Sequence, residues 1–231
     1  MIKAIKRKLN NRTQRDEFVR RQLRQLRDGS KLLDAGAGSQ AYRPYCSHLR
    51  YFAQDFSQYR ADEKPGFADQ MGAGSGYAYG RMDYVGDIWS IAEQDGFFDA
   101  ILCTEVFEHI PYPIQTVREF SRLLRPGGTL ILTAPSNCLR HMDPYFFYTG
   151  FSDRFYERIL GEHGFSIREL YPVGDYYRWL GVEMARTAAT HSVFAKALLL
   201  PGCLYYLAKK STAKSVNTLC MGYHVVAVKK T

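Results

Sequence analysis

The sequence predicts an α/β protein in which a mostly parallel sheet carries helices on both faces. Short apolar runs bounded by Gly or Pro alternate with longer segments of helical periodicity, which is the pattern of strand–helix–strand units. The run from Phe97 to Cys103 is apolar almost throughout, as a strand buried on both faces requires. With 231 residues, the chain is long enough for one domain with a sizeable core.

The predicted elements follow one another in a regular order. A basic amphipathic helix is predicted up to about Asp28, because Phe18, Val19 and Leu23 recur at helical spacing. Strands are predicted at 31–35, 51–55, 82–88, 97–103, 129–133, 165–171 and 221–228. Helices are predicted at about 41–49, 114–124 and 152–163, with an apolar helical insertion at about 176–210 and a loop or insertion at 60–82. We interpret the chain as an N-terminal helix over 1–29 and one domain over 30–231.

The net charge of +8 is concentrated at the N-terminus. Residues 1–31 contain eleven Lys and Arg against three Asp and Glu, so the remainder of the chain is formally neutral. The basicity therefore belongs to an N-terminal arm and argues against a nucleic-acid-binding protein as a whole. The arginines at 20–27 are most simply a solvated helix face.

The five cysteines are scattered and form no C-x-x-C pair, which argues against a disulfide framework and against a zinc site. This usage fits a reducing compartment, and we expect a cytoplasmic protein. The charged N-terminus lacks the apolar region of a signal peptide. The most apolar stretch, 193–208, is interrupted by Lys196 and Pro201 and is too short for a simple transmembrane helix.

Residues that bind a nucleoside cofactor are predicted where the first two strands end. The first strand continues into Asp34, Gly36 and Gly38, and glycines there allow the backbone to approach a ligand closely. Asp55 ends the second strand, where a carboxylate can accept both ribose hydroxyl hydrogens. Ligands of open parallel sheets lie outside these carboxyl ends, so the residues are expected to line one site.

Two further strand ends complete the predicted site. Asp87 and Ile88 follow the third strand, where a polar group could meet an adenine amino group and an apolar one its ring. Thr104 and Glu105 follow the fourth, and Glu105 is expected to orient the far end of the cofactor. The alternative for the aspartates is that they cap helices and form turns. Glu105 and Glu108 could also form an acid/base pair, although Glu108 is more simply interpreted as a helix N-terminal carboxylate favoured by the dipole.

The sequence resembles the class I S-adenosylmethionine-dependent methyltransferases, and specifically those with a methyltransferase domain of the ubiquinone-biosynthesis type. The resemblance rests on LLDAGAGSQ, the acidic end of YFAQD, DYVGDI, FFDAILCTEVFEHI and RLLRPGGTLILTAP, over about residues 30–135. It implies a Rossmann-like sheet of seven strands with an antiparallel last strand, and S-adenosylmethionine as cofactor. By position, Asp34, Gly36 and Gly38 would line the methionine portion, Asp55 the ribose, and Asp87 with Ile88 the adenine.

The segment after Pro135 carries the candidate acceptor residues. The stretch HMDPY with Tyr148 and Thr149 is similar to bacterial methyltransferases linked to cell-surface polysaccharide or secondary-metabolite pathways. Tyr145 and Tyr148 are candidates to face the acceptor, and otherwise they form a packed cap. His109 and His141 are candidate general bases, and otherwise structural histidines. Nothing in the sequence requires a metal.

The predicted function is transfer of a methyl group from S-adenosylmethionine to an oxygen acceptor, with nitrogen second, on a small molecule, glycan or lipid-linked substrate. An RNA methyltransferase is the runner-up because of the basic arm. A nicotinamide-dependent oxidoreductase is a rival, although Ala41 stands where its third glycine would be. A non-catalytic binding module of this fold is another.

The two ends of the chain suggest a peripheral membrane contact. The basic arm at 3–27 could lie on an acidic surface, and the apolar segment at 193–208 could insert into it, with Lys209 and Lys210 as interfacial anchors. The alternatives are that the apolar segment is a lid or a dimer interface and that the arm covers the cofactor site. The sequence leaves the oligomeric state open.

Overall fold

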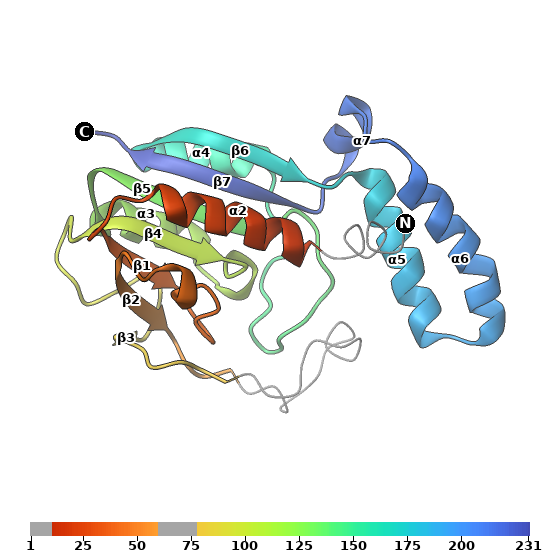
Figure 1. Cartoon of the computed structure of the whole chain (residues 1–231), viewed down its shortest axis with the longest axis horizontal. Coiled ribbons are helices and arrows are strands. Elements are labelled where there is room, and N and C mark those ends of the chain that lie inside the picture. The colour runs from red at the N-terminus through yellow and green to blue at the C-terminus, as the bar shows by residue number, and fades with distance from the viewer. Residues whose placement is uncertain (1–10, 60–77) are drawn as a thin grey trace.

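The computed structural model describes residues 11–59 and 78–231. Its centre is a sheet of seven strands in the order β3-β2-β1-β4-β5-β7-β6 (Figure 1). The strands are β1 (Lys31–Ala35), β2 (Arg50–Asp55), β3 (Tyr84–Val85), β4 (Phe98–Thr104), β5 (Leu124–Pro135), β6 (Phe165–Val173) and β7 (Gly222–Lys229). β7 runs antiparallel to both β5 and β6, and the other pairings are parallel. The predicted fold class and the antiparallel last strand are thus confirmed.

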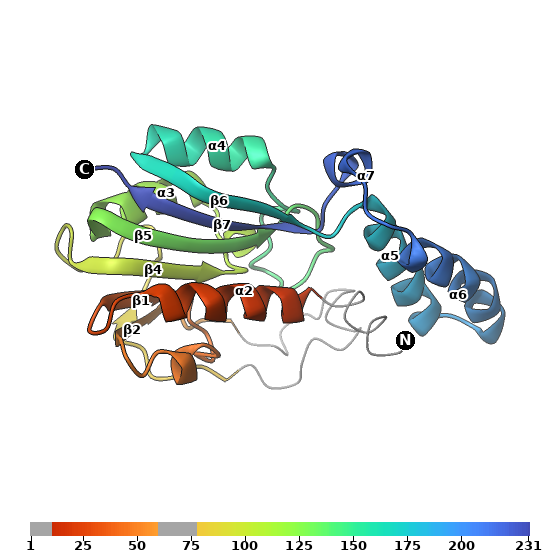
Figure 2. The same cartoon turned by 45° about the horizontal axis from the view of Figure 1, so that its top comes forward.

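Helices cover both faces of the sheet, as predicted (Figure 2). One face carries α3 (Pro113–Leu123) and α4 (Asp153–Glu162), which contribute Phe120 and Tyr156 to the larger core cluster. The other face carries α2 (Arg12–Gln25). Its residues Phe18, Val19 and Leu23 pack with strand residues in a second cluster. The N-terminal helix is therefore held on the sheet by apolar contacts.

Three further helices lie between β6 and β7. They are α5 (Tyr176–Thr190), α6 (Val193–Ala208) and α7 (Ala213–Thr218). α5 and α6 form a hairpin that projects beyond the end of the sheet (Figures 1 and 2). The predicted helical insertion is present, whereas α7 was not predicted; its capping box, made by Thr212 and Ser215, is a short-range signal for its start.

Three local predictions were wrong. Residues 41–49 form only a 3₁₀ turn, Arg43–Tyr45, because Pro44 has no N–H to donate within a longer helix. The third strand is two residues long, because Gly86 at φ 145° turns the chain away. β5 begins at Leu124 and includes the Pro-Gly-Gly stretch, which a register shift opposite β4 accommodates. The candidate loop at 60–77, like residues 1–10, lies outside the described residues.

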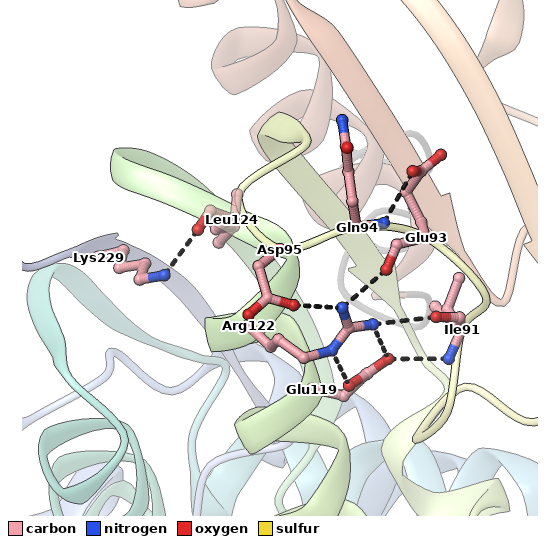
Figure 3. Close-up of polar contacts among 8 residues, drawn as sticks. All are labelled: Ile91, Glu93, Gln94, Asp95, Glu119, Arg122, Leu124 and Lys229. Carbon is pink, nitrogen blue, oxygen red and sulfur yellow. Dashed lines mark hydrogen bonds and ion pairs between the residues drawn. The ribbon is translucent and has the colours of Figure 1, made fainter.

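A hydrogen-bond network fixes the loop that follows β3. Arg122 of α3 donates to the carbonyl oxygens of Ile91 and Glu93 and to the carboxylate of Asp95 (Figure 3). The Glu119 carboxylate accepts from Arg122 and from the backbone N–H of Ile91. These hydrogen bonds raise the pKa of Arg122 and hold the loop against α3. The loop is thereby positioned for the site described next.

Candidate functional site

A cavity of about 520 Å³ opens at the carboxyl ends of β1, β2 and β4. Its walls come from the loops after those strands, from the loop after β3, from α2 and from the segment around Tyr145. The lining includes Asp34, Gly36, Asp55, Asp87, Ile88, Thr104 and Glu105. The strand ends that the sequence singled out therefore meet in one place, as the geometry of an open parallel sheet requires.

The turn after β1 is shaped by glycine. Gly36 has φ 75°, and a Cβ atom added to it would lie 2.4 Å from Val106 Cγ2. Its N–H donates to the backbone and side-chain oxygens of Gln54, at 2.9 and 3.2 Å. Gln54 Nε2 in turn donates to the Gly86 carbonyl oxygen at 2.7 Å. This buried amide ties the β1 turn to the β3 turn, and it could not be found from the sequence because a lone Gln carries no motif.

Asp34 lies under this turn and is almost completely buried. The Tyr51 hydroxyl donates to its carboxylate at 2.5 Å. Burial raises the pKa of Asp34 to about 7; the Tyr51 hydrogen bond opposes that shift and the nearby Asp55 adds to it. A buried carboxylate facing the cavity favours a cationic ligand group, whose charge would return the pKa towards its ordinary value.

Asp55 is oriented by backbone donors on both oxygens. The N–H of Gly38 donates to Oδ2 and the N–H of Ser57 donates to Oδ1, each at 2.9 Å. Burial raises the pKa of Asp55 while these hydrogen bonds lower it. A carboxylate has about four acceptor positions, so two remain to accept ribose hydroxyls. Gly38 itself does not line the cavity, and the structure places it behind Asp55.

The loop after β3 forms the wall beside Asp55. Ile88 is buried and lines the cavity together with Asp87 and Trp89. The Trp89 indole packs edge-on against Tyr112 at 5.2 Å between ring centroids. Apolar faces beside an exposed carboxylate suit a planar base with a hydrogen-bonding edge.

Glu105 is held in an uncommon conformation at the end of β4. Its φ is 53°, in the left-handed region that non-glycine residues seldom adopt. The Thr133 hydroxyl donates to Oε1 at 2.8 Å, and Arg15 of α2 approaches Oε2 at 3.6 Å. Arg12, Asp16 and Arg20 of α2 also line the cavity, so α2 forms one of its walls.

Two histidines and a buried glutamate meet beside the cavity. The rings of His109 and His141 pack edge-on at 4.6 Å, and Glu108 Oε1 lies 3.7 Å from His109 Nε2. His109 Nδ1 donates to the Tyr145 carbonyl oxygen at 2.7 Å, and His141 Nδ1 donates to that of Leu139 at 2.8 Å. With Nδ1 donating, Nε2 is the nitrogen of each ring that remains to accept a proton. His109 lines the cavity, whereas His141 does not line it and contacts the His109 ring.

The same three residues have the composition of a metal site. One ligand atom from each of Glu108, His109 and His141 lies within 4.8 Å of the others. Burial, followed by repulsion from Glu105, raises the pKa of Glu108 well above its usual range, and its Oε2 has no hydrogen-bond partner. From the sequence these residues were considered separately, and no metal was predicted. Only the fold shows that His141 lies next to Glu108 and His109, which are on the 3₁₀ turn Phe107–His109.

The two tyrosines that were candidates to face the acceptor lie in different places. Tyr145 lines the cavity and packs edge-on against Phe56 at 4.7 Å. The Tyr148 hydroxyl donates to the Pro111 carbonyl oxygen at 3.1 Å, and its ring borders a neighbouring hollow. The backbone N–H groups of Phe147 and Tyr148 both donate to the Glu108 carbonyl oxygen, which holds this segment over the cavity.

Comparison with known proteins agrees with this arrangement. A family model described as a methyltransferase domain matches residues 33–132. The ubiquinone biosynthesis O-methyltransferase of Xanthomonas campestris pv. campestris is 52% identical over 53 residues, which is 23% of this chain and 21% of that protein. The matched part is thus about a fifth of the relative's length.

Solved structures share the fold across nearly the whole chain. The phosphoethanolamine N-methyltransferase 2 of Haemonchus contortus, in complex with S-adenosyl-L-methionine, has a TM-score of 0.54 at 17% identity and covers 94% of this chain and 52% of its own. A geranyl diphosphate methyltransferase in complex with GPP and sinefungin has a TM-score of 0.56 at 17% identity, covering 93% and 77%. At such identities the likeness shows the fold.

Family match and fold point the same way. Residues 33–132 match a methyltransferase domain, and nearly the whole chain shares its fold with solved methyltransferases, one of them in complex with S-adenosyl-L-methionine. The rival nicotinamide fold has a sixth parallel strand, whereas here β7 is inserted antiparallel between β5 and β6. The cavity can hold such a cofactor, because the glycine turn at Gly36 and the Asp55 carboxylate both line it.

Proposed function

We propose that the protein transfers a methyl group from S-adenosylmethionine to an oxygen acceptor on a small molecule, glycan or lipid-linked substrate. The observation that carries the proposal is the convergence of Asp34, Gly36, Asp55, Ile88 and Glu105 on one cavity. Ligands of open parallel sheets lie outside the carboxyl ends of the strands, and these five positions line the cavity at that edge.

Each residue has a role in this proposal. The Asp55 carboxylate accepts from the ribose hydroxyls, and Ile88 lies against the base, whose amino group donates to Asp87. The turn at Gly36 contacts the methionine portion, and Asp34 and Glu105 face its positive groups. Thr104 lines the same end of the cavity. Gly38 acts indirectly, because its N–H orients Asp55.

The cofactor supplies a methyl carbon that its sulfonium already activates. The protein therefore has to place the acceptor atom in line with that carbon and exclude water. Such alignment is worth roughly 7–11 kcal/mol of the barrier. Tyr145 and Phe56 form an aromatic wall at the mouth, where an apolar part of the acceptor can pack.

An oxygen acceptor also has to lose its proton. His109 is the candidate that lines the cavity, and His141 contacts its ring. A hydroxyl that donates to the basic Nε2 nitrogen of His109 would become a better nucleophile, an effect of about 10²–10⁴-fold. The O-methyltransferase among the relatives supports oxygen over nitrogen as the acceptor.

A radiolabel experiment tests the proposal. Tritiated-methyl S-adenosylmethionine is incubated with the protein and with separate lipid, glycan, small-molecule and RNA fractions. We expect label in a lipid, glycan or small-molecule product with the wild type, and much less with Asp55→Ala when the cofactor concentration is limiting. Label in RNA alone would overturn the acceptor class, and cofactor binding without label in any fraction would favour a binding module over an enzyme.

A further inference from the structure

Helix α6 leaves one whole face uncovered by the fold. Phe194 is 78% exposed, Leu198 67% and Leu204 53%, although each is large and apolar. These residues recur along the helix together with Tyr205, so they form one stripe. Lys196 is the single charged residue of α6. A surface helix of a protein in water normally turns charged residues outward, and this one turns apolar residues outward.

The opposite face of α6 is tightly packed. Cys203 and Leu207 are buried there against α5. A Cβ on Gly181 of α5 would lie 2.8 Å from the Leu207 side chain, and one on Gly202 would lie 2.9 Å from Met184 Sδ. The two helices therefore approach closely through small residues. The α5–α6 hairpin is therefore well packed internally, and the exposed stripe is the face of α6 that the described residues leave uncovered.

The charges on α6 and on the segment that follows it have one sign. From Val193 to Thr218, over α6 and α7, the sequence contains four lysines and no Asp or Glu. At the end of α6, Lys209 lies over the Tyr205 ring at 4.6 Å from its centroid, and Lys210 follows it, exposed. Tyrosine and lysine beside an apolar stripe are the residues that sit at the boundary between lipid headgroups and acyl chains.

We propose that the α5–α6 hairpin docks the protein on an anionic lipid surface, with the α6 stripe inserted between the headgroups and the lysines on the lipid phosphates. None of the helices in the described parts of the chain is long and apolar enough to cross a membrane. A helix of sixteen residues whose uncovered face is apolar fits insertion parallel to the surface. A second copy of the chain fits less well, because a two-fold interface would bring like charges together.

Sedimentation with vesicles tests this docking on the full chain. We expect binding to vesicles of phosphatidylglycerol and phosphatidylcholine, little binding to phosphatidylcholine alone, and a fall in binding as salt rises. The double variant Leu198→Gln and Leu204→Gln should weaken binding about tenfold or more. Lys209→Gln with Lys210→Gln should do the same at low salt, since each lysine contributes to attraction by the surface.

A matched control replaces two exposed apolar residues elsewhere, Ile114→Gln with Tyr171→Gln, and should bind vesicles as the wild type does. Calorimetry with the demethylated cofactor shows that every variant is folded, and it makes failure of docking distinguishable from failure of the proposed methyl transfer. A wild type that stays in the supernatant at low salt overturns the proposal. The proposal is also overturned if vesicle binding is absent and analytical ultracentrifugation shows a dimer that the double variant Leu198→Gln and Leu204→Gln dissociates.

Discussion

Replacing Asp55 by alanine tests the central cofactor contact. In the folded protein the carboxylate accepts from the N–H groups of Gly38 and Ser57, and its remaining acceptor positions face the cavity. Without it, the ribose hydroxyls of a bound cofactor would lose their partner in a largely buried site. Leaving such groups unpaired costs about 1–3 kcal/mol. The dissociation constant should therefore rise by roughly 5- to 150-fold.

Isothermal calorimetry with the demethylated cofactor measures this change, and a matched variant separates it from damage to the sheet edge. Asp83→Ala also removes a carboxylate that accepts from a backbone N–H, that of Ala53 at 2.8 Å, but Asp83 does not line the cavity. Both variants should lower the melting temperature, and only Asp55→Ala should weaken binding. Unchanged affinity in Asp55→Ala, or an equal loss in Asp83→Ala, would refute the assignment.

Three further predictions follow from the site. Gly36→Ala should weaken cofactor binding by about tenfold or more, measured by the same calorimetry, because the new Cβ would meet Val106 at 2.4 Å and φ is 75°; normal affinity would contradict the tight turn. His109→Ala should lower the turnover number about 10²-fold, and His141→Ala should lower it less. Wild-type turnover in both variants would mean that catalysis depends on alignment of the acceptor alone. Loss of activity on adding a chelator would instead indicate a metal at this cluster. The pKa of Asp34, raised from 3.8 to about 7, contributes to the free energy of unfolding while the carboxyl is protonated. This contribution, about 4 kcal/mol at most, should be complete below pH about 4 and should be lost as the pH rises through about 7. Denaturant unfolding should show this pH dependence in the unliganded wild type and not in Asp34→Asn.

Much of the site could be predicted because its signals are local. The Gly36 turn, the carboxylate of Asp55 and the pair Asp87–Ile88 each follow a strand directly, and parallel strands bring such ends together whatever the rest of the chain does. The strand order and the antiparallel β7 came with the family resemblance and not from periodicity.

The contacts that the sequence did not show have a different origin, because they depend on partners distant in sequence. Gln54 bridges two turns, Arg20 stacks on the Tyr45 ring at 4.3 Å, and Arg21 pairs with Glu169 at 2.7 Å. Spacing along a helix shows that an arginine faces away from the apolar side. It cannot show which aromatic rings or carboxylates of a neighbouring element lie within reach of that arginine. The interpretation of the arginine run as a solvated face holds for most of it, since Arg21, Arg24 and Arg27 are exposed, but it did not show that Arg20 lines the cavity.

The position of α2 has a practical consequence for fragments of this protein. The family match begins at residue 33, yet Phe18, Val19 and Leu23 cover the sheet face formed in part by Leu32 and Leu102. A fragment trimmed to the matched residues would expose that apolar face to water and would be prone to aggregation. A shortened chain intended for crystallisation or for fusion to another domain should accordingly retain the residues from Arg12 onward, even though their charge makes them look dispensable.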